Sequence, residues 1–164
     1  MTVSVRPLEE RDVDAVVEFS VRAWAPVFES MCAVMGRTIF SRVYPDWKPA
    51  QARAVESVIR DNCSRVWVAE SSGRLAGFVA VVFHDRDGAK AGEIEMVAVD
   101  PEFQNQGIGL TLVSSAVDEI GNLGIPLAEI GTGGDPGHAP ARRVYEKAGF
   151  TALPLVRYYK ALDT

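Results

Sequence analysis

The chain has 164 residues, 48% of them hydrophobic, and a formal net charge of −5 at pH 7. A chain of this length and composition is expected to form a single domain over residues 1–164 around one hydrophobic core. Its Lys and Arg residues are scattered without a basic run, and therefore nucleic acid is not expected as a partner.

Cysteine content and hydropathy bear on metal binding and location. The two cysteines, Cys32 and Cys63, are too few for a metal cage and do not resemble the disulfide framework of a secreted protein. The first residues contain no apolar stretch of signal-peptide length, and no apolar run is long enough to cross a membrane. We therefore expect a cytoplasmic protein with no bound metal and no membrane partner.

The N-terminal part is predicted to contain one strand and two helices. Residues 2–6 are a short, β-branched segment typical of a strand. The first helix has apolar residues at helical spacing, namely Val13, Val16, Val17, Val21 and Trp24. The second helix is indicated by Ala52, Val55 and Ile59 and is expected to end near Cys63.

The segment between these helices has a different character. Residues 24–48 are rich in aromatic residues and methionine and contain Pro26, Gly36 and Pro45. Such a segment is typical either of an irregular or broken helix over a cavity or of ordinary helix packing.

From residue 65 onward the apolar period changes to two, which is typical of strands. Residues 65–70 and 75–83 flank the turn signal SSGR and are predicted to form a hairpin. A loop over residues 84–92 is predicted to lead into a third strand at residues 93–99.

The remaining elements complete a mixed α/β pattern. A helix is predicted from the apolar stripe of Ile108, Leu112, Val113, Ala116, Val117 and Ile120. Residues 127–131 are predicted as a strand, residues 140–148 as a short helix, and residues 150–153 and 156–162 as two strands that complete the sheet.

Two glycines one residue apart, Gly107 and Gly109, precede the long helix of this pattern. A P-loop would need a Lys-Ser/Thr pair after the second glycine, and a dinucleotide fingerprint would need a third glycine where Leu112 stands. We therefore interpret the segment as a loop whose N–H groups, from about residue 104 to 110, converge on an anion at a helix N-terminus. A plain turn into a helix is the alternative interpretation.

The sequence VAVDPEFQNQGIG (residues 97–109) resembles the acetyl-CoA-binding motif of the GCN5-related N-acetyltransferase (GNAT) family, usually written Q/R-x-x-G-x-G/A. PARRVYEKAGF (residues 140–150) resembles a later helix of the same family. The opening VSVRPLEERDVDAV and the element order also fit, so the resemblance extends over essentially the whole chain. It implies a GNAT-like fold, with a largely antiparallel sheet flanked by helices, and an acyl-CoA-dependent N-acetyltransferase with acetyl-CoA as the acyl donor.

The resemblance also implies a cofactor site. In this family the strand before the motif separates from the next strand, and the pantetheine arm lies in the gap, bonded to strand backbone as an added strand would be. The residues so implied are Val97, Ala98, Val99, Gln104, Asn105, Gln106, Gly107, Ile108, Gly109, Leu110, His138 and Tyr145. His138 stands where many members carry Asn. It is interpreted as a donor to the cofactor, a partner of Asp135, a proton shuttle or a residue that orders its loop.

Transfer of an acetyl group from a thioester to an amine needs a base for the ammonium and an acid for the leaving thiolate. Glu93 matches a strand position that some family members use for the general base, and Glu95 is a second candidate. Strict alternation would place both carboxylates on the face of the strand that carries Val97 and Val99. Tyr145 matches a family tyrosine beside the cofactor sulfur and is predicted to be the general acid, with a core tyrosine as the alternative.

The acceptor is predicted to be the primary amine of a small molecule or peptide, which attacks the thioester directly in a ternary complex. Trp24, Phe28 and Met31, with Tyr44 and Trp47, are predicted to line its pocket. Two other classes of function stay open, namely an acyl-CoA-binding sensor without turnover and a nucleotide-binding domain that would bind ATP or NAD. A homodimer is an open alternative to a monomer.

Overall fold

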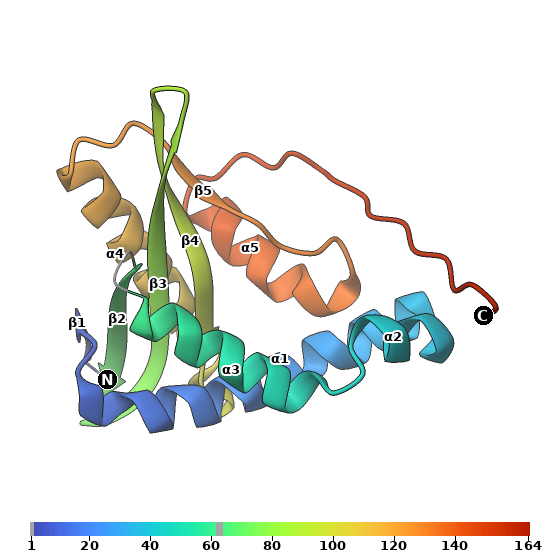
Figure 1. Cartoon of the computed structure of the whole chain (residues 1–164). Coiled ribbons are helices and arrows are strands. Elements are labelled where there is room, and N and C mark those ends of the chain that lie inside the picture. Colours follow the sequence, from blue (N-terminus) through green and yellow to red (C-terminus); the bar gives the residue numbers. More distant parts are fainter. Residues whose placement is uncertain (1, 62–63) are drawn as a thin grey trace.

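The computed structural model describes residues 2–61 and 64–164, so Cys63 lies outside the described residues. It contains a mixed sheet whose strands are ordered as they occur in the chain (Figure 1). The strands are β1 (Val3–Pro7), β2 (Ser64–Ser71), β3 (Arg74–Arg86), β4 (Ala89–Val99) and β5 (Ala128–Ile130). β1 to β4 pair antiparallel, whereas β5 pairs parallel to β4, which confirms the predicted mixed α/β class.

Helices cover both faces of this sheet. They are α1 (Val13–Met35), α2 (Arg37–Val43), α3 (Trp47–Arg60), α4 (Ile108–Asn122) and α5 (Ala139–Lys147), with short 3-10 turns at Glu10–Asp12, Pro101–Phe103 and Pro136–His138. One apolar core, which includes Ile94 and Leu112, joins the sheet to α4 and α5. A second core, which includes Phe19, Val55 and Phe78, joins the opposite face to α1 and α3.

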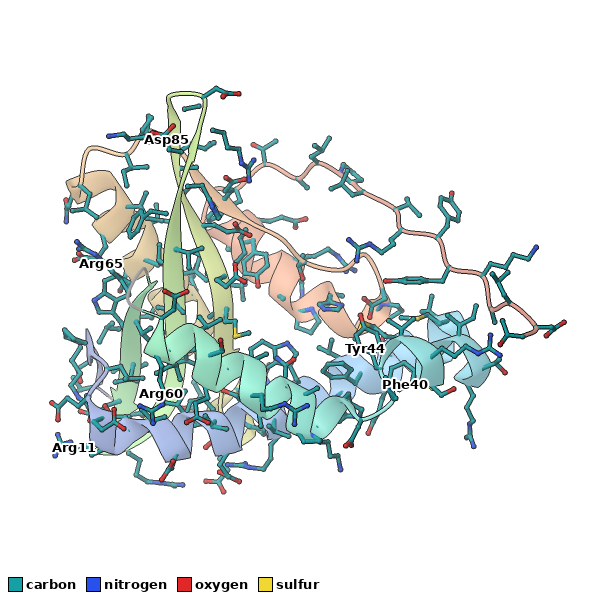
Figure 2. The ribbon with its side chains drawn as sticks, in the orientation of Figure 1. Arg11, Phe40, Tyr44, Arg60, Arg65 and Asp85 are labelled. Carbon is teal, nitrogen blue, oxygen red and sulfur yellow. The ribbon has the colours of Figure 1, made fainter. Side chains whose placement is uncertain are left out.

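The hairpin between β3 and β4 is longer than predicted, because most of residues 84–92 belong to strands and not to a loop. The chain reverses at Asp87 and Gly88, whose φ angles are 53° and 86°. An Asp-Gly pair in the left-handed region closes a two-residue hairpin turn, and this dipeptide was the missed signal. The hairpin projects beyond the other strands (Figure 1), and Asp85 lies near its tip (Figure 2).

Residues 24–48 are mostly helical. α1 continues through Pro26, so the predicted break there is wrong, and the helix ends at Gly36, whose φ of 80° suits glycine. Phe28 is buried with 6% exposure and stacks on Trp47 at a centroid distance of 4.3 Å. Ordinary helix packing therefore accounts for the aromatic content of this segment.

The two predicted C-terminal strands are absent. Residues 150–164 form no strand and run past α5 toward the end of the molecule where α2 lies (Figure 1). The apolar and aromatic residues of this segment favour β structure, but a strand also needs a neighbouring edge with which to pair. We call residues 150–164 the C-terminal arm.

Asp12 links β1 to the start of α1. Its carboxylate is buried with 4% exposure of the residue, and it accepts hydrogen bonds from Arg6 Nη1 at 2.7 Å and from the Glu9 N–H at 2.8 Å. The hydrogen bond from Arg6 lowers the pKa of Asp12 despite the opposing effect of burial.

Acid should remove the stabilisation that Asp12 supplies. Because its folded pKa is below the unfolded value of about 3.9, this contribution is present above that value and is lost as pH falls through the folded pKa. Asp12→Asn should lower the free energy of unfolding by about 1–3 kcal/mol at neutral pH. Below about pH 4 this free energy should fall less in the variant than in the wild type. Urea unfolding across this pH range measures both effects. Asp14→Asn, at an exposed residue of α1, is the control, and equal acid dependence in all three proteins would contradict the assignment.

Candidate active site

β4 contains a bulge at Glu95. In the register with β3, Met96 pairs with Ala80, but Val81 pairs with Ile94, so Glu95 has no partner. An unpaired extra residue of this kind bends the strand and breaks its alternation of faces.

The bulge reverses the predicted face of Glu93, the candidate general base. Ile94 packs into the same core as Val97 and Val99, on the α4 side, whereas Ala98 packs into the core on the α1 side. Glu93, next to Ile94 and before the bulge, therefore faces the α1 and α3 side. The prediction that it shares a face with Val97 and Val99 is wrong, because that prediction assumed unbroken alternation.

Glu93 lies in a small group of charged and titratable side chains. His84 Nε2 on β3 lies 2.5 Å from Glu93 Oε2, and Glu129 on β5 is the direct neighbour of Glu93 in the sheet. Arg86 Nη2 forms an ion pair with Glu129 Oε1 at 3.4 Å, although this buried oxygen accepts no hydrogen bond among the described residues. Sequence reasoning missed His84 and Glu129, since only strand register brings them to Glu93.

The two strands that carry these carboxylates separate immediately afterwards. β5 pairs with β4 only over Gly92–Ile94. From Glu95 to Val99 no strand of the described chain pairs with this edge of β4. An edge of this kind leaves backbone groups available to an extended ligand.

The segment after β4 presents free N–H groups. Within the described residues, no backbone N–H of residues 104–110 donates a hydrogen bond, and the first donor of the helix is Thr111, whose N–H reaches the Gly107 carbonyl at 3.0 Å. Asn105 and Gly107 have φ values of 62° and 80°. Such a loop at the start of α4 can bind an anion through its N–H groups and the helix dipole.

Gly107 and Gly109 differ in what requires them. The positive φ of Gly107 suits glycine by itself. Gly109 has no positive φ, and a Cβ added there would lie at ordinary contact distance, 3.7 Å, from side-chain carbons of Val99 and Val144. Packing within the chain therefore does not demand glycine at 109, whereas close approach of a ligand to the N–H groups would.

Asp100 fixes the entry to this loop. It is buried with 6% exposure, and its Oδ1 accepts hydrogen bonds from the Glu102 N–H at 3.0 Å and from Arg22 Nη1 at 3.2 Å. Its own N–H donates to the Ala76 carbonyl at 2.8 Å. Sequence reasoning missed Asp100 and Arg22, although Asp before Pro at the start of a short helix was a usable capping signal.

Tyr145 on α5 lies on the same side of the sheet as α4. Its ring packs against the apolar core that joins the sheet to α4 and α5. It also contacts the ring of Phe150, at a centroid distance of 6.4 Å. Burial raises the pKa of Tyr145 to about 12, so the hydroxyl stays protonated at neutral pH. The neighbouring Val144 lies close to Gly109. This contact places α5 beside residues 104–110, the segment with unpaired N–H groups.

His138 is held by its own loop. Its Nδ1 is paired with Asp135 Oδ1, and Asp135 Oδ2 accepts a hydrogen bond from Ser30 Oγ on α1 at 2.5 Å. Burial raises the pKa of Asp135, but the hydrogen bonds from Ser30 and His138 outweigh it and leave the pKa lowered. Of the interpretations of His138, pairing with Asp135 is confirmed, and its predicted contact with a cofactor stays a prediction.

The predicted acceptor-pocket residues do not form one open wall. Phe28 contacts Tyr44 edge-on at 5.3 Å and lies buried between α1, α2 and α3, so it packs these helices together. Trp24 packs partly buried against the α1 core, and Met31 is partly exposed. Tyr44, which follows α2 (Figure 2), is half-buried and also contacts the ring of Phe40 at a centroid distance of 5.4 Å. Substrate contacts by Trp24 and Met31 stay predictions.

Within residues 2–61 and 64–164, no group of three or more His, Cys, Asp or Glu side chains could hold a metal ion. In the same part of the chain, no helix has the length and apolar character needed to cross a bilayer.

The fold and site define an α/β domain in which a free strand edge continues into a loop of unpaired N–H groups at the start of a helix. A profile of the acetyltransferase (GNAT) family matches residues 33–150, and the chain belongs to this family.

Curated relatives include mycothiol acetyltransferases. That of Amycolatopsis mediterranei is 28% identical over 153 residues, which cover 86% of this chain and 43% of the relative. That of Thermomonospora curvata is 34% identical over 96 residues, which cover 58% of this chain and 31% of the relative. The chain thus spans less than half the length of these relatives.

Solved structures share the fold. The aminoglycoside N-acetyltransferase AAC(6')-Iy, bound to a CoA-containing bisubstrate analogue, superposes with a TM-score of 0.67 at 17% identity, covering 99% of this chain and 100% of that chain. The ribosomal-protein-alanine N-acetyltransferase of Brucella melitensis superposes with a TM-score of 0.66, also at 17% identity and with the same coverage. At these identities the likeness shows the fold alone.

Proposed function

We propose that the chain is an acetyl-CoA-dependent N-acetyltransferase. The observation that carries the proposal is the continuity of the free β4 edge with the unpaired N–H groups of residues 104–110. These N–H groups would hold the pyrophosphate, and the backbone of Val97 to Val99 would hold the pantetheine arm. When bound, acetyl-CoA supplies an acetyl group activated as a thioester. Family membership and the relatives named as acetyltransferases support this function.

The acceptor proposed is a cationic primary amine of a small molecule or peptide. Glu93 and Glu129 are neighbours at the point where β4 and β5 separate, and Ile94 and Ala128 beside them pack on the opposite face. Two adjacent carboxylates repel each other and together attract an ammonium group. Arg86 forms an ion pair with Glu129, and the partner of Glu93 is His84, so no lysine or arginine pairs with Glu93 within the described residues. The acceptor would therefore approach from the side of the sheet covered by α1 and α3.

The proposed reaction uses two residues, one for the proton of the ammonium and one for the charge on the leaving sulfur. Glu93 takes a proton from the ammonium, directly or through water, while His84 orients the carboxylate through their 2.5 Å contact. The neutral amine then forms the C–N bond of the amide as the C–S bond of the thioester breaks, and the second proton lost by the amine passes to the released thiolate or to water. Tyr145, whose hydroxyl is protonated at neutral pH, donates a hydrogen bond to the leaving sulfur. A panel of amines incubated with acetyl-CoA tests the function through release of the free thiol. A sensor without turnover would bind the donor and release none.

Gly109→Val should weaken CoA binding by roughly 100-fold or more, because the added side chain would lie against Val99 and Val144 and fill space beside the N–H groups proposed to hold the phosphates. Isothermal titration calorimetry measures this affinity, and the smaller Gly109→Ala should have an intermediate effect. Gly121→Val is the matched control, since Gly121 lies in the same helix, also without a positive φ and with open space around it. Unchanged affinity in a folded Gly109→Val protein would contradict the assignment of the loop.

A further inference from the structure

α1 is hydrogen-bonded to the chain on both sides of the gap that opens between β4 and β5. On one side, Arg22 donates to the carboxylate of Asp100, from Nη1 at 3.2 Å and from Nη2 at 3.3 Å, and Asp100 follows directly after β4. On the other side, Ser30 Oγ donates to Asp135 Oδ2 at 2.5 Å, in the segment after β5. α1 runs from the first strands of the sheet toward the start of α5 (Figure 1). One helix therefore contacts the chain just beyond each of the two strands that separate.

The contact at Ser30 is closely packed. The side chain of Asp135 is only 11% exposed, and the N–H of Gly137 donates to Ser30 Oγ at 2.8 Å. A Cβ added at Gly137 would lie 2.5 Å from the Cβ of Ser30, so only glycine lets this turn approach α1 so closely. From the α5 side, Arg142 Nη1 donates to the carbonyls of Gly133 at 2.6 Å and of Asp135 at 2.9 Å. The segment after β5 is therefore held from two directions.

The spacing of these two contacts along α1 matches the width of one extended chain. Ile94 of β4 pairs with Ile130 of β5, and paired strands lie about 4.8 Å apart. Asp100 and Asp135 stand six and five residues further along the chain from this pair. The α1 residues that bind them are eight positions apart, which is about 12 Å along a helix. An extended chain that lies between two others needs about 10 Å from one neighbour to the other.

We propose that α1 is a spacer that holds the gap between β4 and the segment after β5 at the width of the pantetheine arm, with Arg22 and Ser30 as positioning residues. This inference rests on the proposed function, because it assumes that the gap receives the arm of CoA. A gap held open before binding spares the ligand the cost of ordering its walls. Without the hydrogen bond from Ser30, the segment after β5 is freer to move relative to β4, and that cost falls on binding.

Binding of two ligands to the full chain, measured by isothermal titration calorimetry, tests this proposal. The ligands are CoA and its nucleotide half, 3′-phospho-ADP, which carries the pyrophosphate but not the pantetheine arm. Ser30→Ala should raise the Kd of CoA by roughly tenfold, as the loss of one hydrogen bond would, and leave the Kd of 3′-phospho-ADP unchanged. Ser20→Ala is the matched control and should change neither, because Ser20 is a buried serine of α1 whose hydroxyl has no hydrogen-bond partner among the described residues.

The two affinities together separate the outcomes. Equal losses for both ligands in Ser30→Ala would mean that Ser30 supports residues 104–110 or the fold as a whole, and an unchanged CoA affinity would mean that the gap keeps its width without this hydrogen bond. Either result would overturn the spacer role. Arg22→Met should weaken both ligands, since Asp100 also binds the Glu102 N–H at the entry to residues 104–110, and wild-type CoA affinity in this variant would overturn the role of Arg22. A wild-type chain that binds neither ligand would contradict the proposed function itself, and this inference with it.

Discussion

Glu93→Gln should reduce turnover by roughly 10²- to 10⁴-fold at neutral pH, with no comparable change in CoA affinity or in the free energy of unfolding. Glutamine keeps the size of the side chain and can still accept a hydrogen bond from His84, but it cannot take a proton from the acceptor. The site proposed for CoA lies along β4 beyond the bulge and in residues 104–110, so its contacts would be retained. Steady-state kinetics, calorimetry and urea unfolding measure the three quantities.

The loss in Glu93→Gln should shrink as pH rises. An alkyl amine has a pKa of about 10.4, so at neutral pH nearly all of it is protonated and must lose a proton before it attacks. As pH rises toward that value, more amine arrives neutral and the base has less to do. The activity of the variant should therefore climb toward that of the wild type, which a merely structural role of Glu93 would not produce.

Glu95→Gln is the control for this variant. Glu95 is exposed and occupies the bulge without a partner residue, and its loss should have the smaller effect on turnover. If Glu95→Gln loses activity while Glu93→Gln does not, the two roles are reversed. If both variants keep full activity, the proton leaves by another route, with His138 as the next candidate.

Features determined locally could be predicted from the sequence. The loop with Gly107 and Gly109 was correctly placed before a helix, because free N–H groups at a helix start follow from local backbone geometry. The helical stripe that includes Ile108 and Leu112 was equally clear, since it buries one face of a regular helix.

Features that depend on strand pairing could not be predicted in the same way. A bulge inserts one residue without changing the types of its neighbours, so the sequence around Glu95 still reads as a continuous alternation. The neighbours of Glu93 across the sheet, His84 and Glu129, depend on the register of three strands. The C-terminal arm shows the same limit, because its residues favour a strand, whereas the formation of a strand depends on a neighbouring edge that the local sequence does not specify.

Tyr145→Phe should reduce turnover by about 10²-fold and change the free energy of unfolding by no more than about 0.5 kcal/mol. Phenylalanine retains the packing of the ring against Phe150 and the α4 core. Within the described residues the Tyr145 hydroxyl makes no hydrogen bond, so its removal leaves no buried partner unsatisfied. Wild-type turnover in this variant would leave Tyr145 as a packing residue.

The raised pKa of Tyr145 defines how its hydroxyl would act. Full proton transfer from a hydroxyl of pKa about 12 to a thiolate whose thiol has a pKa of about 8.5 would be uphill by roughly 5 kcal/mol. Tyr145 should instead stabilise the thiolate by a hydrogen bond, which lowers the pKa of the CoA thiol when it is bound. Ultraviolet titration of bound CoA should therefore show thiolate at lower pH in the wild type than in Tyr145→Phe. Identical titrations would mean that the hydroxyl does not contact the sulfur.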